Sequence, residues 1–348
     1  MRVLITGHDG YIGSVMAPIL RSAGHEVVGL DTYLFEDCGT GKNGSEFLAI
    51  RKDVRDVALS DLQGFDAIVH LAALCNDPLG HLNPDWTFDI NHAASYRLAK
   101  LAKKAGVRRF LYASSCSMYG AAGGGLVNEE APLRPLTPYA VSKVRAEQAI
   151  SELASPDFSP VLMRNATAYG MSPRLRADVV LNNLVCWAYT TGTVRITSDG
   201  TPWRPIVHIE DIANACAAAL TAPQDAVHNQ AFNVGTNEEN YQVHDLAEIV
   251  RETVPGCEVE YAEQAGPDPR SYRVDFSKIL DTLADFRPKW NARLGAQELF
   301  VAVQRLGLTL EEFQSRKYIR LVQFKHLLGE AYLDDTLRWR KTVQAASK

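Results

Sequence analysis

Short apolar runs alternate with longer segments of helical spacing through the first half of the chain. Five apolar runs have the pattern of buried strands: residues 3–6, 26–30, 67–71, 109–114 and 160–164. Three segments have the spacing of amphipathic helices: residues 12–23, 91–106 and 139–153. Strands that alternate with helices predict a parallel sheet with crossover helices. We therefore expect an α/β fold with a doubly wound parallel sheet over residues 1–168.

The alternation weakens after about residue 168, where Gly, Pro, Arg and polar residues interrupt the apolar runs. We expect residues 169–348 to form mostly a smaller, mixed α/β domain. Residues 232–234 have the pattern of a strand, so the chain is expected to return to the first sheet near 230–236. The smaller domain would then be discontinuous. Helical spacing between residues 308 and 339 predicts a helical C-terminal region.

The charge balance limits the kinds of partner. The chain has 348 residues and a formal net charge of −5. It lacks the basic excess that nucleic-acid binding needs, so we expect no nucleic-acid partner. Basic residues recur near the C-terminus, and we expect them to form the solvated side of an amphipathic helix. They are Arg316, Lys317, Arg320 and Lys325.

Cysteine spacing and the lack of long apolar runs bear on location. The six cysteines are scattered without a C-x-x-C pair or other metal-ligand spacing. This predicts reduced thiols and no metal site. The chain opens directly into the first strand-like run, without a signal peptide, and no apolar run is long enough to span a bilayer. We expect a cytoplasmic protein without a membrane partner.

A glycine turn, Gly7, Gly10 and Gly13, follows the first strand-like run. Between a strand and a helix, such a turn lets backbone N–H groups approach a phosphate, and the helix dipole favours the anion. This context predicts a dinucleotide site in a Rossmann-like domain. Asp31 ends the second strand, where a carboxylate accepts hydrogen bonds from ribose hydroxyls and repels a 2′-phosphate. Because no Arg or Lys occurs in residues 32–34, NAD is favoured over NADP.

Tyr139 and Lys143 lie four residues apart in a predicted helix and so share one face. A free tyrosine titrates near ~10 and is a poor base at neutral pH. We expect the Lys143 ammonium to lower the pKa of the phenol by roughly one to three units. Together with the glycine turn, this pair predicts hydride transfer to the cofactor, with Tyr139 handling the matching proton.

Three serines follow the fourth strand-like run: Ser114, Ser115 and Ser117. The carboxyl edge of a parallel sheet is where ligands bind. A serine hydroxyl here can hold a substrate oxygen while Tyr139 exchanges its proton. Serines after a strand are also ordinary turn residues, and spacing alone does not choose among the three.

These motifs together resemble the extended short-chain dehydrogenase/reductases, in particular the nucleotide-sugar epimerases and dehydratases such as UDP-glucose 4-epimerase. The resemblance extends from Met1 to about Ser277. The matching motifs are Thr6-Gly7-x-x-Gly10-Tyr11-Ile12-Gly13, His70-Leu71-Ala72-Ala73, Ser114-Ser115-x-x-x-Tyr119-Gly120 and Pro138-Tyr139-x-x-x-Lys143. By this resemblance, residues 169–348 mostly bind the substrate, a nucleotide-diphosphate sugar. Relatives commonly dimerise through helices that match residues 93–104 and 139–153, which implies a homodimer.

The resemblance also implies roles for individual residues. Tyr139 is the implied catalytic base and acid, Lys143 its electrostatic partner, and Ser115 the hydroxyl that orients the substrate. Asn91 matches a helix asparagine behind the catalytic lysine, whereas Asp53 follows another strand-like segment and is either beside the adenine or only solvated. The expected cofactor contacts are Gly7, Gly10, Tyr11, Ile12, Gly13, Asp31, Asp53, Val54, Leu71, Ala73, Asn91 and Lys143. The expected substrate contacts are Ser115, Ser117, Thr167, Asn183, Arg204 and Asp268.

Departures from the family motifs narrow the reaction. The 4,6-dehydratases carry an Asp-Glu pair where this chain has Cys116 and Ser117. Epimerases acting at C3 and C5 place a cysteine at the position of Ser117, whereas Cys116 is expected to pack in the interior. Two reactions at one carbon remain: 4-epimerisation with NAD retained through turnover, or reduction of a 4-keto-sugar. A third alternative is a nucleotide-sensing regulator, against which the intact Tyr139 and Lys143 argue.

The motifs define the substrate less closely. Thr167 stands where many relatives have asparagine, and Ala265 replaces an arginine that often precedes the position of Asp268 by three residues. Other basic side chains are candidates to neutralise the diphosphate instead. They are Arg174, Arg176, Arg270 and Arg273. The sugar and the base are therefore left open.

Overall fold

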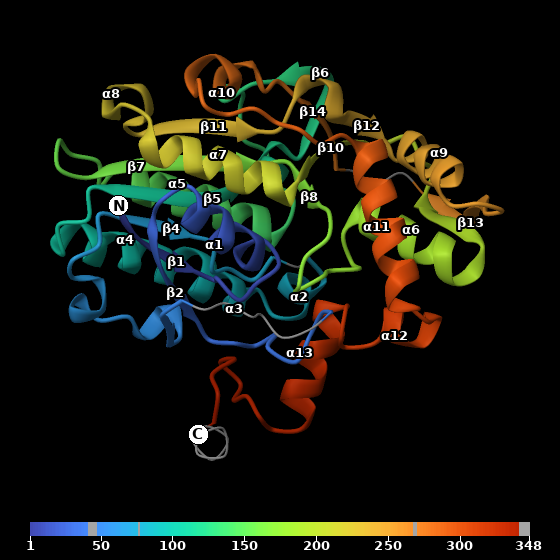
Figure 1. The fold of residues 1–348 in the computed structure, drawn as a ribbon, viewed down its shortest axis with the longest axis horizontal. Helices are drawn as coiled ribbons and strands as arrows, with labels where there is room; N and C mark the ends of the chain where they lie inside the picture. Colours follow the sequence, from blue (N-terminus) through green and yellow to red (C-terminus); the bar gives the residue numbers. More distant parts are fainter. Residues whose placement is uncertain (41–46, 76, 267–269, 341–348) are drawn as a thin grey trace.

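A seven-stranded parallel sheet forms the centre of the structure (Figure 1). The computed structural model describes residues 1–40, 47–75, 77–266 and 270–340. The strands lie in the order β11-β7-β5-β4-β1-β2-β3. Their bounds are Arg2–Thr6 (β1), Glu26–Asp31 (β2), Ala49–Arg51 (β3), Ala67–His70 (β4), Arg109–Ser115 (β5), Ser159–Asn165 (β7) and Gln230–Val234 (β11). All five strands predicted for the first half are present.

Helices cover both faces of this sheet, as the consecutive apolar residues of its strands require. The covering helices are α1 (Gly13–Ser22) and α7 (Ile209–Thr221) on one face, and α4 (Ser95–Lys104) and α5 (Pro138–Ser151) on the other. Val3 and Ile5 of β1 pack in the core of the first face, and Leu4 packs in the core of the second. The fold is the doubly wound α/β type that the sequence predicts.

The strand order reverses between β1 and β4. From β1 the chain continues outward through β2 and β3, and from β4 it continues to the opposite edge through β5, β7 and β11. Ligands of such sheets bind at the carboxyl ends of the strands beside this point. β11 pairs in parallel with β7, so the chain returns to the sheet after leaving it. The division into domains near residue 168 stays a prediction.

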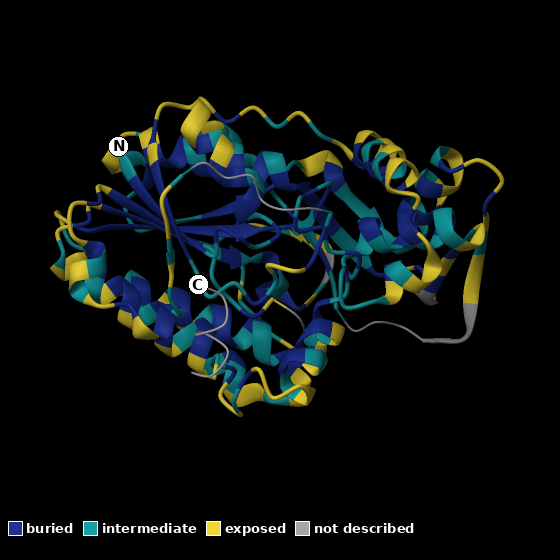
Figure 2. Cartoon of the chain, turned by 60° about the horizontal axis from the view of Figure 1, so that its bottom comes forward, coloured by how far each residue is buried: buried dark blue, intermediate teal, exposed yellow. Residues whose placement is uncertain are grey.

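A smaller group of strands and helices follows β7 and lies beside the buried strands of the large sheet (Figure 2). It contains the three-stranded sheet β12-β10-β8 and the pair β13-β9. The element bounds are Thr167–Tyr169 (β8), Thr193–Ser198 (β9), Trp203–His208 (β10), Asn240–Gln242 (β12), Glu258–Gly266 (β13), Val180–Thr191 (α6), Val243–Thr253 (α9) and Ala292–Leu306 (α11). Its own apolar core includes Leu181, Leu246 and Leu299. A further pair joins β6 (Ala121–Val127) to β14 (Ser271–Val274).

The C-terminal region packs against the face of the large sheet that α4 and α5 cover. The predicted helix over residues 308–339 is only partly present, because α13 (Arg320–Gly329) ends well before an isolated bridge between Leu333 and Trp339. Phe324 and Leu327 of α13 pack in the same core as the α4 face of the sheet. The remaining short helices are α2 (Asp77–Leu82), α3 (Pro84–Thr87), α8 (Gln224–Val227), α10 (Ser277–Thr282) and α12 (Leu310–Gln314).

The basic residues near the C-terminus do not form one solvated face. Lys325 is exposed, but Arg320 is buried, so the prediction is wrong at Arg320. Its guanidinium donates to the carbonyl of Arg174 at 2.7 Å and lies 4.2 Å from the centroid of the Phe35 ring. Within the part of the chain that the structure describes, no helix has the length and apolar content needed to cross a bilayer.

Candidate active site

The glycine turn joins β1 to α1 at the switch point of the sheet. Gly7 has a left-handed φ of +78°, and a Cβ there would lie 2.8 Å from the amide nitrogen of Ala72. A Cβ on Gly13 would lie 2.2 Å from the carbonyl oxygen of Gly7. Only glycine fits these two positions. The turn places the N-terminus of α1 at the carboxyl edge of β1, a geometry that fits the pyrophosphate of a dinucleotide.

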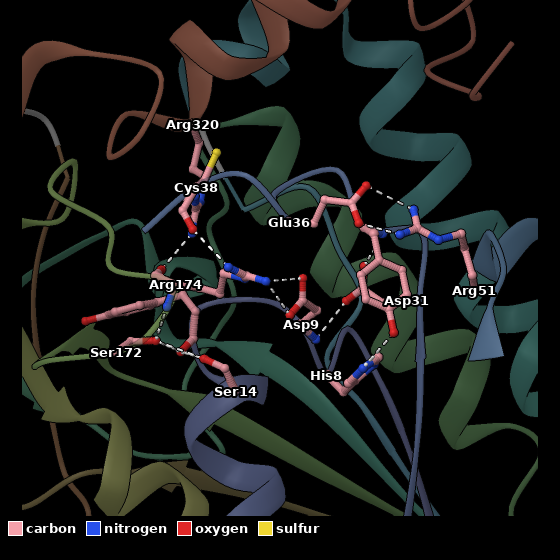
Figure 3. Close-up of polar contacts among 12 residues, drawn as sticks. His8, Asp9, Ser14, Asp31, Glu36, Cys38, Arg51, Ser172, Arg174 and Arg320 are labelled. Carbon is pink, nitrogen blue, oxygen red and sulfur yellow. Dashed lines mark hydrogen bonds and ion pairs between the residues drawn. The ribbon is translucent and has the colours of Figure 1, made fainter. Parts of the chain in front are cut away.

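Asp31 ends β2 beside this turn (Figure 3). Its carboxylate accepts hydrogen bonds from the N–H of Asp9 at 3.0 Å and from the N–H of Tyr33 at 2.8 Å. Burial raises the pKa of Asp31, and the negative charge of Asp9 acts in the same direction. The position fits a carboxylate that binds the adenosine ribose of the dinucleotide.

Asp9, inside the glycine turn, forms a buried ion pair with Arg174 (Figure 3). Arg174 Nη2 lies 2.8 and 2.9 Å from the two carboxylate oxygens. Arg174 belongs to the segment between β8 and α6, in which Ser172 also donates to the carbonyl of Tyr11 at 2.8 Å. This segment of the smaller region is therefore bound to the turn. The sequence makes Arg174 a candidate for the substrate diphosphate, but its guanidinium is engaged by Asp9.

The other predicted cofactor contacts lie along the same edge. Asp53 caps the short 3-10 helix Val54–Asp56, and its Oδ2 lies 2.6 Å from Nη2 of Arg55. The alternative of a merely solvated Asp53 is therefore wrong, while contact of Asp53 and Val54 with adenine stays a prediction. Leu71 and Ala73 follow β4 in the loop that packs against Gly7.

Helix α5 carries Tyr139 and Lys143 to the end of β5. Thr137 caps this helix by accepting a backbone N–H at 3.2 Å, and Pro138 occupies its first turn. Lys143 is buried, and its ammonium donates to the carbonyl of Ala113 in β5 at 2.7 Å. Its Nζ lies 5.8 Å from the centroid of the Tyr139 ring. The two side chains thus share one face of the helix.

The structure distinguishes the three serines that follow the run in β5. Ser114 is buried, and its hydroxyl donates to the sulfur of Met118 at 3.4 Å. Ser115 lies beside Tyr139, whose pKa its hydroxyl acts to lower, and it donates to Oγ of Ser117 at 2.9 Å. Ser115 is therefore the serine that influences Tyr139, and Ser117 is bonded to Ser115.

Burial dominates the protonation of the Tyr139–Lys143 pair. Removal of water raises the pKa of Tyr139 well above its ordinary value of 10.0 and lowers the pKa of Lys143. The hydrogen bond with Ser115 opposes the increase at Tyr139. The predicted decrease of the Tyr139 pKa is wrong for the protein chain alone, because desolvation raises the pKa of the phenol and the negative charge of Asp77 acts in the same direction.

Asn91 lies in a π-helical stretch, Phe88–Ala94, that leads into α4. Its buried side chain exchanges hydrogen bonds of 2.7 and 3.0 Å with the backbone of Leu74. Its Nδ2 also donates to Oγ of Ser142 at 3.2 Å. Asn91 therefore joins the loop after β4 to the helix that carries Lys143, which puts it behind the lysine. Single π turns inside helices are frequent at functional sites.

The predicted substrate contacts that the structure describes, apart from the serines, lie in the smaller region. Thr167 begins β8, and Asn183 on α6 donates to a backbone carbonyl at 2.9 Å. Arg204 on β10 donates to the carbonyl of Arg270. Asp268 lies outside the described residues. The structure therefore brings Arg204 and Arg270 together, while Asn183 sits on a separate helix.

The alternative cations for the diphosphate all have partners. Arg176 pairs with Asp178 at 2.8 Å, and Arg270 pairs with Asp77 at 2.7 Å. The guanidinium of Arg273 lies 4.6 Å from the centroid of the Trp203 ring. The negative charge of Asp77 also raises the pKa of Tyr139. Asp77 begins α2, which packs against the N-terminus of α5: a Cβ on Gly80 would lie 3.9 Å from the amide nitrogen of Tyr139.

Cys75 and Asp77 follow β4 and belong to none of the sequence motifs described above. Cys75 is exposed and is a titratable neighbour of both Tyr139 and Lys143. Asp77 begins α2. Because β4 is the neighbour of β5, the segments that follow the two strands reach the same edge. The feature of the sequence that could have identified Cys75 and Asp77 is their position shortly after a strand of the sheet.

The fold and the Ser-Tyr-Lys arrangement define a Rossmann-type enzyme that works with a bound dinucleotide. A family profile described as the NAD dependent epimerase/dehydratase family matches residues 3–235. The chain belongs to this family, and the prediction of NAD as its cofactor is confirmed at that level. The UDP-glucose 4-epimerase of Mycolicibacterium smegmatis is 32% identical over 294 residues, which cover 81% of this chain and 92% of that protein.

Solved structures of similar proteins agree with the fold. MoeE5, solved in complex with UDP-glucuronic acid and NAD, is 28% identical with a TM-score of 0.76, and the match covers 88% of this chain and 100% of that one. TunA, an NAD dependent-NDP-hexosamine 5,6-dehydratase, has a TM-score of 0.78 at 24% identity, covering 87% of this chain and 98% of that one. The likeness to TunA shows the fold alone.

Proposed function

We propose that this enzyme is an NAD-dependent nucleotide-sugar 4-epimerase that acts through a transient keto-sugar. The observation that carries the proposal is the grouping of Ser115, Tyr139 and Lys143 at the sheet edge beside the glycine turn. The positions that hold an acid pair in 4,6-dehydratases do not supply one here. Cys116 is buried with its sulfur donating to a backbone carbonyl at 3.1 Å, and Ser117 is bonded to Ser115.

Each residue has a defined task in this proposal. Tyr139 takes the proton of the C4 hydroxyl as C4 is oxidised, and Ser115 holds the same substrate oxygen. Lys143, fixed on the carbonyl of Ala113, stabilises the phenolate by its charge. Bound NAD⁺ supplies the hydride acceptor and a positive ring that favours the phenolate. After the keto-sugar turns within the site, Tyr139 returns the proton as the opposite face of C4 is reduced.

The relatives support a nucleotide-diphosphate sugar as the substrate. One is named UDP-glucose 4-epimerase, and another was solved with UDP-glucuronic acid and NAD. We assign the diphosphate to the neighbourhood of Arg204 and Arg270. Arg270 pairs with Asp77 at the start of α2, and α2 packs against the N-terminus of α5 at Tyr139. Asn183 is the side chain proposed for the nucleotide. The homodimer and the cytoplasmic location stay predictions.

Turnover without added cofactor tests the reaction. Purified enzyme is incubated separately with UDP-glucose, UDP-galactose and UDP-glucuronic acid, and products are followed by NMR. We expect one of these sugars to be converted to an equilibrium mixture of its C4 epimers, with Tyr139→Phe as the inactive control. If none of these sugars is converted, and a nucleotide-linked 4-keto-sugar is instead reduced with one NADH or NADPH consumed per turnover, the alternative reduction by the same residues is established.

A further inference from the structure

Two guanidinium groups lie near Asp31, although residues 32–34 contain no basic side chain. Arg51 is the register partner of Asp31 across the β2–β3 pair. Arg174 binds Asp9, whose own N–H donates to Asp31 at 3.0 Å. An arginine beside the adenosine ribose is the usual means of accepting the 2′-phosphate of NADP. The fold therefore brings two potential NADP ligands to a site whose carboxylate favours NAD.

A carboxylate engages each of these guanidinium groups (Figure 3). Arg51 donates from Nη1 to Glu36 at 3.2 Å, and its guanidinium lies 4.2 Å from the centroid of the Tyr33 ring. Arg174 binds both oxygens of Asp9 and also donates to the carbonyl of Cys38 at 3.0 Å. Three carboxylates thus face two cations, so one negative charge is in excess.

We propose that Asp9 and Glu36 are specificity residues that act with Asp31 to select NAD against NADP. Each holds one arginine away from the ribose and cancels its charge. The 2′-phosphate of NADP, which carries close to two negative charges at neutral pH, then meets an excess of negative charge and no available guanidinium. The proposal concerns cofactor choice alone and is tested by binding without any sugar, so it does not depend on the 4-epimerase reaction.

The two pairs should contribute unequally. The Arg174 and Asp9 side chains are only 5% and 3% exposed, whereas those of Arg51 and Glu36 are 43% and 37% exposed. Charges interact more strongly in the drier environment, and exposed ion pairs are weak. Loss of the Asp9 charge should therefore change selectivity more than loss of the Glu36 charge.

The test compares the dissociation constants of NAD and NADP in Asp9→Asn and Glu36→Gln, measured by calorimetry in the absence of sugar. We expect the ratio of the NADP constant to the NAD constant to fall about tenfold or more in Asp9→Asn, and on the order of twofold in Glu36→Gln. Glu147→Gln is the matched control, because Glu147 forms a buried ion pair with Arg164 at 2.8 Å elsewhere in the sheet domain. It should leave the ratio unchanged.

A double variant separates selectivity from simple damage to the turn. Asp9→Asn with Arg174→Met removes both charges of the pair, so the NAD preference should return even if both cofactors bind less tightly. If Asp9 is only a structural residue, Asp9→Asn will weaken both cofactors equally, and an unchanged ratio overturns the proposal. If Asp9→Asn does not fold, the surface variant Glu36→Gln decides, because an unchanged ratio there contradicts the shared role of the two carboxylates.

Discussion

The proposed catalytic end of the site and its proposed adenosine end are built in different ways. The catalytic end, defined by Ser115, Tyr139 and Lys143, comes from one strand and the next long helix along the chain. The adenosine end, defined by Asp9, Asp31 and Arg174, requires an ion pair between residues 165 positions apart. The chemistry is therefore encoded locally, while the hold on the cofactor depends on the completed tertiary structure.

The C-terminal region adds a third segment to the adenosine end. Gln323 in α13 donates to the carbonyl of Leu34 at 3.0 Å, and Trp339 donates to the carbonyl of Thr32 at 2.6 Å. Both carbonyls belong to the loop that follows Asp31. Loss of the Ser115 or Tyr139 hydroxyl should therefore lower kcat with little effect on NAD affinity, and changes at the adenosine end should do the reverse.

The largest expected effect is that of Tyr139→Phe. Removal of the hydroxyl eliminates the group that exchanges the proton, so kcat should fall by about 10²–10⁴-fold. The dissociation constant of NAD should change by no more than about twofold, because the lost hydroxyl acts in the transition state and does not hold the cofactor in the ground state. Steady-state kinetics and calorimetry measure the two quantities, with Tyr96→Phe on α4 as the control. A large loss of NAD affinity would contradict the separation of the two ends.

Ser115→Ala and Ser114→Ala form a matched pair within the catalytic end. Ser115 lies beside Tyr139 and influences its pKa, so loss of the Ser115 hydroxyl should lower kcat about 10–100-fold through loss of substrate positioning. The Ser114 hydroxyl has one hydrogen bond in the described structure, to the sulfur of Met118. Its removal should lower the free energy of unfolding by about 1 kcal/mol or less and leave kcat unchanged. Equal kinetic effects of the two variants would show that Ser115 has no special position.

His70 links stability to pH beneath the catalytic end. Its ring is buried and bonds Thr6 at 2.6 Å and Ser95 at 2.8 Å, and burial lowers its pKa from 6.5 to about 3. The unfolded chain therefore takes up a proton below about pH 6.5 that the folded protein does not bind. Because only the unfolded chain binds this proton, the free energy of unfolding should fall by about 1.4 kcal/mol per pH unit as pH falls from 6 toward 3.

Thermal and urea unfolding between pH 7 and 4.5 measure this slope. His70→Gln should be less stable at pH 7 but should lose less additional stability on acidification, whereas His81→Gln, an exposed control, should keep the wild-type slope. Parallel pH profiles for the wild type and His70→Gln would show that His70 does not determine the acid sensitivity.

The smallest effect is expected from Gln323→Met in α13. The variant keeps the side-chain volume but removes the hydrogen bond to Leu34, which is worth about 1 kcal/mol. NAD affinity should fall about two- to fivefold, because the loop after Asp31 is less firmly held, while kcat at saturating NAD stays the same. Lys325→Gln, exposed on the same helix, is the control. A change in kcat without a change in NAD affinity would show that Gln323 supports the catalytic end and not the adenosine end.

Sequence patterns were sufficient for the elements whose residues lie close together in the chain. The apolar runs located five strands, and the spacing of Tyr139 and Lys143 placed both on one helix face. The pattern could not show that Arg320 is buried, because the covering loop lies almost 300 residues earlier. It also could not show the pKa of Tyr139, since desolvation depends on everything packed around the phenol.

The same limit applies to cofactor selection. Residues 32–34 contain no basic side chain, yet Arg51 reaches Asp31 across a strand pair and Arg174 approaches through Asp9. Register between strands and contacts between remote segments decide which charges surround a ligand, and neither is written in a short motif. The motif identifies the carboxylate, and the tertiary structure determines what surrounds it.

The contacts of Trp339 and Gln323 with the loop after β2 have a consequence for biosynthesis. The ribosome makes that loop well before its binding partners, which lie 289 and 307 residues later in the chain. A nascent chain can form the large sheet and yet lack the outer support of the ribose site. Firm capture of NAD should therefore wait until Gln323 and Trp339 have been made and have packed against that loop.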